Sequence, residues 1–380
     1  MPPTGNISTA YKLVIILLLG AIIILFPISL PPGAGDWDLQ AYWSSAYLFA
    51  HGRDFSDSTA LGEIEHTLTT RDDPETLYSW FSPIGNVVLF PLTFIPFTRA
   101  VYYWLVLNII LLFYSATLIW NDTDSRTWIP LLATFSFSMT VVSLVFGQIN
   151  FLEVLGLALF LSLNKREKPF LAGASLVLTT IKPHLVILTL PILLLDLLRK
   201  KEWKALTGFA AGLAFCFILL FVFYHHWFQS FLTVVTSGMS TVRETPNING
   251  LLVLLKEYNL GKLIWLIALV GGIVWWWQRG KIWDRRTFID ISVTIGLIVS
   301  PIGWSYDQVM LLFPILSLLS WAARDRLPNR MTKSVLSLLV AANLISYYQR
   351  TYAPSDVMFF WVPVLILGLY LFAQRKLQTI

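Results

Sequence analysis

The sequence predicts an all-α polytopic membrane protein, folded as one integral membrane domain over residues 1–380. Hydrophobic residues make up 56% of the chain and charged residues only 13%, a composition that argues against a water-soluble globule. Apolar runs long enough to cross a bilayer as helices recur along the chain, and basic residues gather in the short polar segments between them. At roughly 20 residues for each span, about twelve transmembrane helices are expected.

The first apolar run, Tyr11 to Leu30, is interpreted as a retained membrane anchor. A signal peptide would have a shorter apolar core and a small-residue cleavage pattern, whereas this run is followed by Pro31, Pro32 and Gly33. Residues 31–83 come next and hold nine acids, with only Arg53 and Arg71 as bases. We expect this segment to be a large first extracytoplasmic loop.

Two carboxylates, Asp36 and Asp38, stand at the start of this loop, directly before a run of helical period from Leu39 to Ala50. Apolar and aromatic residues recur on one side of that run, which predicts an amphipathic helix lying in the membrane interface. Two interpretations of the acids remain open. They are solvated loop residues or helix N-caps, or one of them is held beside apolar walls, where partial desolvation raises its basicity.

The basic clusters predict the orientation of the protein, because cytoplasmic loops carry an excess of lysine and arginine. The clusters lie within residues 165–168, 199–204, 279–286, 324–333 and 375–376. The polar turns between them are then extracytoplasmic, namely residues 146–150, 181–184, 225–250, 300–308 and 346–356. Both termini are expected to be cytoplasmic in a plasma-membrane protein. This topology accounts for the net charge of +5, so no nucleic-acid partner is predicted.

The segment from Ile84 to Trp120 is too long for one helix across a bilayer, and it contains Pro91 and Pro96. Two full crossings in this segment would place every later basic loop on the outer side of the membrane. We therefore expect Ile84 to Pro96 to form a partial or re-entrant helix.

Lys182 interrupts an otherwise apolar stretch and is followed by Pro183. The pair predicts a broken helix whose apex carries a cation together with His184. An ionisable residue among membrane spans is a candidate for function, and a lysine that extends its ammonium to the interface is the structural alternative. The expected extracytoplasmic position, where basic residues are disfavoured, favours the functional interpretation.

The turn FGQIN places two amides, Gln148 and Asn150, between apolar helices, with Glu153 one turn further on. The amides either cap the helix that begins at Phe151 or face a binding site. Glu153 is either a buried acid or a first-turn partner of the helix dipole. The motifs of soluble nucleotide-binding enzymes are missing from the sequence, and no spacing of histidines, cysteines and acids supports a divalent metal, so no cofactor is predicted.

Five stretches of the sequence are informative through their order and spacing: DLQAYWSSAYLFAHGRDFSD, LYSWFSPIGNVVLFPLTFIP, FGQINFLEVLGLAL, AGASLVLTTIKPHLVIL and SPIGWSYDQVMLL. Together they resemble glycosyltransferase family 87, the polyprenol-phosphate-mannose-dependent α-mannosyltransferases, which have the GT-C membrane fold. The resemblance covers Asp36 to Leu312, and it implies a GT-C fold with its site on the extracytoplasmic side.

In that family an aspartate of the first external loop is the expected catalytic base. The family's D-x-x-x-Y pattern falls on Asp38 and Tyr42 of this sequence. Asp36 lies two positions away, so it is the lesser candidate, and we group it with Tyr42 as a substrate-binding residue. The resemblance thus implies a chemical role for one of the two acids that follow the first apolar run.

The resemblance also implies transfer of a sugar, mannose in that family, from a polyprenyl-phosphate donor to an extracytoplasmic lipid or glycan acceptor, with inversion. Asp38 would take the proton from the acceptor hydroxyl. Lys182, which matches the family's lysine–proline turn, would neutralise the departing phosphate together with His184. Four side chains expected on the same side would bind the sugar: Gln148, Asn150, Trp304 and Tyr306. Membrane lipids are the remaining expected partners.

A membrane transporter for lipids or small solutes is the alternative function, since broken helices and an intramembrane lysine also mark transporters. Two features of the sequence stand against this alternative. There is no inverted sequence repeat, and the first predicted loop is large and acidic.

Overall fold

The computed structural model describes residues 37–68, 76–120, 128–239, 244–256, 258–279, 284–352 and 355–378. Within these ranges the chain is helical and has no strand, which confirms the all-α class. The predicted anchor from Tyr11 to Leu30 and the acid Asp36 lie outside the described residues, as do residues 69–75 of the predicted first loop. The anchor therefore stays a prediction.

The helices have the following bounds in chain order, with η marking a 3₁₀ helix: α2 (Trp37–Ala50), α3 (Ser58–Leu68), α4 (Ile84–Leu89), η1 (Phe90–Phe94), α5 (Phe97–Trp120), α6 (Trp128–Ser136), α7 (Ser138–Val145), α8 (Phe151–Lys165), α9 (Pro169–Ser175), η2 (Leu176–Thr180), η3 (Pro183–Val186), α10 (Thr189–Arg199), α11 (Trp203–Phe223), α12 (Trp227–Met239), α13 (Ile248–Leu254), α14 (Tyr258–Arg279), α15 (Arg285–Val299), η4 (Ser305–Leu311), α16 (Leu312–Ala323), α17 (Asn329–Tyr352), η5 (Asp356–Phe359) and α18 (Trp361–Gln378).

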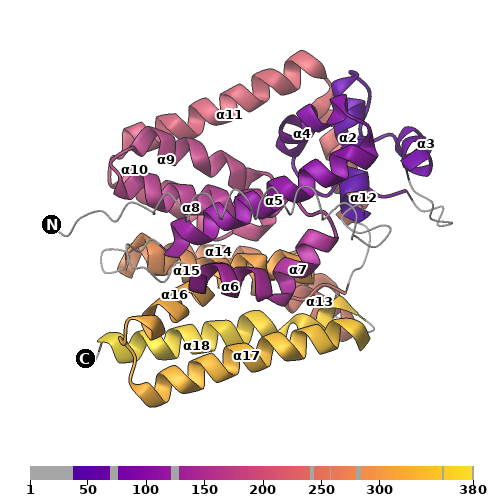
Figure 1. Cartoon of the computed structure of the whole chain (residues 1–380). Helices are drawn as coiled ribbons and strands as arrows, with labels where there is room; N and C mark the ends of the chain where they lie inside the picture. Colours follow the sequence, from indigo (N-terminus) through magenta and orange to yellow (C-terminus); the bar gives the residue numbers. More distant parts are fainter. Residues whose placement is uncertain are drawn as a thin grey trace, which may run out of the picture.

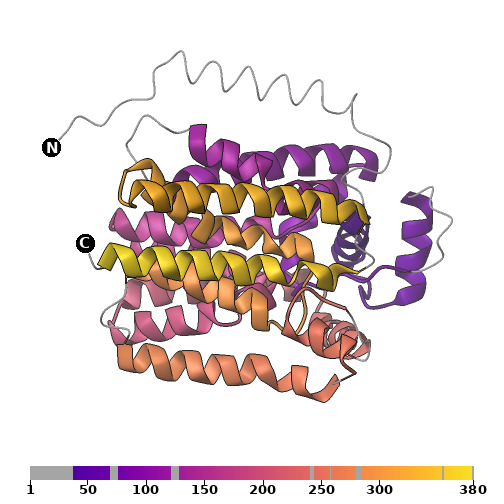
Figure 2. The ribbon, with the colours of Figure 1, turned by 90° about the horizontal axis from the view of Figure 1, so that it is seen from below.

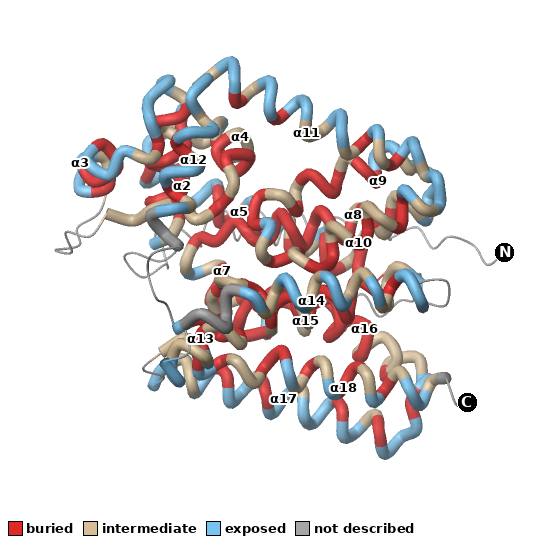
Figure 3. The backbone as a smooth tube through the Cα atoms, turned by 180° about the vertical axis from the view of Figure 1, so that it is seen from behind, coloured by how far each residue is buried: buried red, intermediate tan, exposed pale blue. Residues whose placement is uncertain are grey.

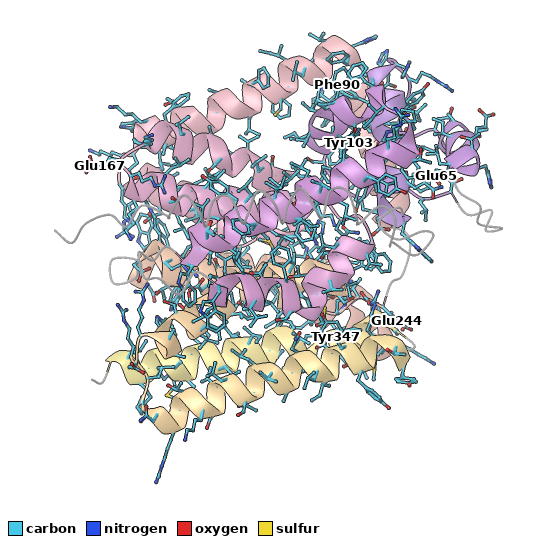
Figure 4. All side chains as sticks on the ribbon, in the orientation of Figure 1. Glu65, Phe90, Tyr103, Glu167, Glu244 and Tyr347 are labelled. Atoms are coloured by element: carbon cyan, nitrogen blue, oxygen red, sulfur yellow. The ribbon has the colours of Figure 1, made fainter. Side chains whose placement is uncertain are left out.

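The long helices lie roughly along one common direction, and two perpendicular views agree on this alignment (Figures 1 and 2). The shorter elements α2, α3, α4, α12 and α13 gather at one end of the bundle (Figure 1). Glu65 and Glu244 lie toward this end, whereas Glu167, in a basic loop, lies at the opposite end (Figure 4). The predicted acidic loop and this predicted basic loop are thus separated along the long axis of the bundle.

Four helices among the described residues are long and apolar enough to cross a bilayer: Phe97–Trp120, Trp203–Phe223, Ser305–Ala323 and Asp356–Leu377. A fifth candidate is the pair α6 and α7, which is bent by 63° at the break between its two helices. Apolar side chains such as Phe215 and Val222 are exposed on α11, whereas α8 is largely buried (Figure 3). These features are those of a multi-pass membrane protein, and the number of about twelve spans stays a prediction.

The segment after the first predicted loop forms short helices only. α4 and η1 together cover Ile84–Phe94, and α5 begins at Phe97, directly after Pro96. Pro91 lies where the α-helix gives way to a 3₁₀ helix, because proline has no N–H to continue the α-helical hydrogen bonds. The segment is much shorter than the roughly 20 residues of a spanning helix, as a partial helix would be.

The predicted helix break at Lys182 is present in the structure. α9 runs into η2, and η3 begins at Pro183. Between them Lys182 adopts φ −117° and ψ 75°, outside the helical region. The cause is local, because the ring of Pro183 disfavours a helical conformation of the residue before it. The break turns the lysine side chain out of the helix axis and into the interior of the bundle, where it is buried.

Close packing of α9 against α11 fixes the helix that leads to this break. A Cβ atom on Gly173 would lie 1.8 Å from the carbonyl oxygen of Ala205, and one on Gly208 would lie 2.0 Å from that of Phe170. Only glycine allows two helix backbones to approach so closely, which is a common basis of helix association in membranes.

Candidate active site

The first turn of α2 is attached to the FGQIN turn at the end of the bundle where the short helices gather. The backbone N–H of Asp38 donates to the carbonyl oxygen of Phe146 at 3.1 Å. The rings of Trp37 and Phe146 lie 5.7 Å apart. Trp37 is exposed and Asp38 is half-buried, so the carboxylate lies at the border between the protein interior and its surroundings.

The structure differs from the expectation that α2 is an amphipathic helix lying on the membrane surface. Its residues from Leu39 to Ala46 are all buried, including the polar Gln40, Ser44 and Ser45. Hydrogen bonds replace solvent for some of these groups, since Gln40 donates to the carbonyl oxygen of Glu65 and Ser45 to the Asn86 side chain, each at 3.0 Å. α2 is therefore held by the surrounding protein, which gives Asp38 a fixed position.

The FGQIN turn owes its shape to a glycine and to two side chains of α5. Gly147 has φ 66°, in the left-handed region that glycine adopts without strain. Trp104 Nε1 donates to the carbonyl oxygen of Gly147 at 2.9 Å, and Asn108 Nδ2 donates to that of Gln148 at 3.1 Å. These hydrogen bonds hold the backbone around Gln148 independently of its side chain.

Gln148 connects the acid of α2 to the lysine of the broken helix. Its Nε2 donates to Asp38 Oδ2. Its Oε1 accepts from Tyr42 Oη at 3.0 Å and from Lys182 Nζ at 2.7 Å. Both of these groups are donors, so the amide oxygen must face them and the NH₂ group must face Asp38. Gln148 is fully buried and its amide is bonded within the protein, while its role in sugar binding stays a prediction.

Lys182 has a carboxylate partner that the sequence analysis did not assign to it. Lys182 Nζ lies 3.0 Å from Asp307 Oδ1, and both side chains are almost completely buried. The ammonium also lies 5.2 Å from the centre of the Tyr306 ring. Burial opposes the charged form, but the surrounding acidic groups, Asp307 first among them, together outweigh it and raise the pKa of Lys182 above its ordinary value. The lysine is therefore a protonated, charge-balanced member of the site.

Ser82 holds the Lys182 turn from outside the broken helix. Its backbone N–H donates to the carbonyl oxygen of Ile181 and its hydroxyl to that of Thr180, both at 2.7 Å. The stretch before α4 is thereby attached to the residues that precede the lysine. The position of Lys182 thus depends on the FGQIN turn, on η4 and on the stretch before α4, all of which are distant from it in sequence.

Asn150 joins the FGQIN turn to η4 and does not cap a helix. It stands at the N-cap position of α8, but its side chain makes no capping hydrogen bond. Asn150 Nδ2 instead donates to the carbonyl oxygen of Tyr306 at 3.1 Å and to Asp307 Oδ1 at 3.4 Å. Asn150 is fully buried and holds Asp307 in place, while its role in sugar binding stays a prediction.

Aromatic rings line the boundary of the site. Trp304 and Tyr306 are stacked, with ring centres 5.9 Å apart and 13° between their planes. Tyr306 is buried and its ring lies 5.8 Å from that of Phe146, whereas Trp304 is half-buried. Trp37 and Trp304 are thus accessible to a sugar, and the prediction for Trp304 stays open.

Asp38 combines the properties of a general base. Burial raises the pKa of its carboxyl to about 6, against the lowering effects of the Lys182 charge and of hydrogen bonds from Tyr306 and Gln148. A carboxylate of this kind is ionised at neutral pH and more basic than an exposed aspartate, which suits proton transfer. Asp36, the second predicted acid, lies outside the described residues.

His184 follows the lysine but does not share its partners. The ring is half-buried, and its Nε2 is buried with no hydrogen-bond partner among the described residues. Burial lowers the pKa of His184 to about 4, so the ring is neutral at pH 7. A neutral imidazole offers a hydrogen bond to a phosphate but no positive charge.

Glu153 lies deep beside these groups, as one of the two interpretations of its position expected. It is fully buried, and neither of its carboxylate oxygens has a hydrogen-bond partner among the described residues. No three histidine, cysteine or acidic side chains in the described part of the chain are placed to hold a metal ion. The sequence carried one signal for Asp307, which is the acid of the quoted stretch SPIGWSYDQ.

Comparison with known proteins was made against families, curated proteins and solved structures. The model of glycosyltransferase family 87 matches residues 80–301, more than half of the chain. The alpha-(1->3)-arabinofuranosyltransferase of Mycolicibacterium smegmatis is 32% identical over 152 residues, which are 38% of this chain and 34% of that protein. The match thus spans about a third of the length of this curated relative. No solved structure matches the chain.

Proposed function

This chain belongs to glycosyltransferase family 87, and from that premise we propose that it is a membrane glycosyltransferase that uses a polyprenyl-phosphate sugar. The acceptor is an extracytoplasmic lipid or glycan. The observation that carries the proposal is the setting of Asp38. This half-buried carboxylate has a pKa raised by burial to about 6, is held by Gln148, and lies beside the exposed ring of Trp37.

Asp38 acts as the general base in the proposed reaction. It takes the proton of an acceptor hydroxyl while the hydroxyl oxygen attacks the anomeric carbon of the donor sugar. The bond between that carbon and the phosphate oxygen breaks, and the phosphate leaves with the electron pair. Attack from the face opposite the leaving group inverts the anomeric centre.

Lys182 supports this reaction through Gln148. The ammonium holds the amide oxygen of Gln148, which directs the amide NH₂ to Asp38 and so orients the carboxylate. The positive charge also favours the ionised form of Asp38, which burial disfavours. The further prediction that Lys182 neutralises the leaving phosphate stays a proposal, and it would require the lysine to share its charge between Asp307 and the phosphate.

The sugar is proposed to be mannose on the basis of the family resemblance. The curated relative carries arabinofuranose in its name, so a pentofuranose is the matched competitor in any test. The site is proposed to face the extracytoplasmic side of the plasma membrane, with both termini in the cytoplasm. The distribution of charged loops supports this orientation, because the basic clusters are in loops predicted to be on the other side.

The direct test is transfer by the purified full chain in liposomes. Radiolabelled polyprenyl-phosphate mannose, glucose and arabinofuranose are supplied separately with an extract of membrane lipids and glycans. We expect one labelled product whose anomeric configuration is opposite to that of its donor. Release of free sugar only, or movement of intact labelled lipid across the bilayer without a product, would contradict the proposal, and the latter would favour a transporter.

A further inference from the structure

Arg350 lies near the site and keeps unused N–H donors among the described residues. It lies near the end of α17, and its side chain is 32% exposed. Nη1 donates to Asp356 Oδ1 at 2.8 Å and to Ser305 Oγ at 3.0 Å. Among the described residues, no acceptor is bonded to its Nε or Nη2. One edge of the guanidinium is therefore fixed while the other has N–H groups to offer.

Two aromatic rings hold the guanidinium in its position. Its central carbon lies 5.4 Å from the ring centre of Phe146 and 5.9 Å from that of Phe359. Phe146 is also the residue whose carbonyl oxygen accepts from the backbone N–H of Asp38. A single residue thus contacts both the proposed base and Arg350, so a ligand bound by the arginine would lie near Asp38.

The exposed surface of α17 on the side away from Arg350 is apolar. Leu344, Ile345, Tyr348 and Tyr352 are all more than half exposed. Tyr347, one turn before the arginine, lies toward the end of the bundle that carries α2 (Figure 4). A partly exposed guanidinium with unused N–H donors fits a ligand with an anionic head. Arginine binds phosphate through two parallel N–H···O bonds, which makes phosphate the best matched head group.

From these contacts we infer that Arg350 binds the phosphate of the polyprenyl-phosphate donor. The inference rests on the proposed function, since it takes the donor to be a lipid phosphate. It differs from the prediction for Lys182 in one respect. Lys182 is buried and already paired with Asp307, whereas Arg350 is accessible and has free donors.

A purely structural ion pair is the competing explanation of Arg350. Asp356 accepts from the backbone N–H of Ser305 at 2.6 Å and from its hydroxyl at 2.9 Å, so the arginine could serve only to attach η5 to η4. The two explanations predict different effects of the loss of Asp356 on phosphate binding. If the pair is structural, loss of either partner has the same effect, whereas loss of Asp356 spares or improves a phosphate site because it releases the guanidinium.

The experiment measures binding of farnesyl phosphate and farnesol to the full chain in detergent micelles by calorimetry. We expect the phosphate to bind the natural protein more tightly than the alcohol by roughly ten- to a hundredfold, the effect of hydrogen bonds to a charged group. Arg350→Gln should abolish this preference and leave farnesol binding unchanged. Asp356→Asn should keep or increase the preference, and Arg350→Lys should retain only part of it.

Three results would overturn the inference. One is a preference for farnesyl phosphate that survives in Arg350→Gln or is unchanged in Arg350→Lys. Another is an equal loss of this preference in Arg350→Gln and Asp356→Asn. The third is displacement of farnesyl phosphate by phosphatidylglycerol at the same concentration, which would identify a site for bulk anionic lipid. Binding needs no sugar and no turnover, so arginine-dependent binding without any transfer activity would contradict the proposed reaction and leave the phosphate site intact.

Discussion

The two ends of the helix bundle each place a carboxylate near a cation, but its hydrogen bonds differ between the two ends. Near the start of α15, Asp290 accepts from Arg286 Nε at 2.9 Å, from Ser317 Oγ at 2.6 Å and from Tyr370 Oη at 3.0 Å. The same arginine donates to the carbonyl oxygens of Ile119 and Phe313. This network joins α15 to α5, α16 and α18.

At the other end, no cation of the described residues is in direct contact with Asp38. Its link to Lys182 passes through the neutral amide of Gln148, and the lysine has its own counter-ion in Asp307. Buried groups beside this network, Glu153 and the Nε2 atom of His184, have no hydrogen-bond partners among the described residues.

The comparison separates a carboxylate that holds helices together from one that is available for chemistry. An arginine in contact and two hydroxyls fix the completely buried Asp290 in place, which leaves no room for a substrate. A half-buried acid oriented by an amide can still gain and lose a proton. Four predictions test this difference, from the largest expected effect to the smallest.

The same substitution at the two acids should have opposite consequences. Asp38→Asn should lower the rate of sugar transfer by roughly 10²- to 10⁴-fold, because a general base is lost, with little change in thermal unfolding. Asp290→Asn should lower the unfolding temperature and leave the rate per folded molecule unchanged. Transfer assays and thermal unfolding on the same samples give both quantities. Asp36→Asn is the control in the loop, and loss of transfer there with normal transfer in Asp38→Asn would identify Asp36 as the base.

The Lys182–Asp307 ion pair should matter more for stability than the Arg286–Asp290 pair, whose arginine is partly exposed. Lys182→Met leaves Asp307 buried without its counter-ion, which should lower the free energy of unfolding by about 3–5 kcal/mol. The double variant Lys182→Met, Asp307→Asn removes both charges and should recover most of that loss. Arg286→Met should cost less, since Asp290 keeps its two hydroxyl donors. Denaturation in detergent measures these free energies of unfolding. An equal loss of stability in Lys182→Met and in the double variant would exclude charge balance as the cause.

The amide between Asp38 and Lys182 should control the pH dependence of transfer. Because the base must be ionised, the pKa of about 6 for Asp38 predicts that kcat/KM falls as the pH drops through about 6. Gln148→Glu removes a donor to Asp38 and adds a negative charge. The acidic limb of the pH profile, where kcat/KM falls, should therefore move upward by about one pH unit. Tyr42→Phe, which removes a donor from the other side of the amide, should leave the limb in place. An unshifted limb in Gln148→Glu would show that the titrating group is not Asp38.

The smallest effect on activity is expected for two cysteine variants that test the orientation of the protein in the membrane. Lys165→Cys and Glu244→Cys lie in loops predicted to be on opposite sides of the membrane, and both should change transfer by less than roughly twofold, as exposed substitutions usually do. A membrane-impermeant thiol reagent added to intact cells should label the cysteine at 244 and not the one at 165. Labelling at 165 alone would reverse the proposed orientation of the site.

The sequence by itself determined the all-α class, the break at Lys182 and the turn that carries Gln148 and Asn150. These features depend on local physics. Apolar runs exclude water-soluble folds, Pro183 acts on the residue directly before it, and Gly147 permits a backbone conformation that other residues resist. Such effects act within a few residues, so they can be read from one stretch of chain at a time.

Only the tertiary structure decided which of these polar residues meet and what each one does. Gln148 reaches Asp38 across 110 positions of sequence, and Lys182 reaches Asp307 across 125. Those contacts exist because helix packing brings α2, the FGQIN turn, the broken helix and η4 to one end of the bundle. The same packing buries α2 against the expectation of a surface helix and joins the Asn150 side chain to Asp307, so that it does not cap α8. A buried polar group must find a partner wherever packing places it, and local sequence carries no record of which partner that will be.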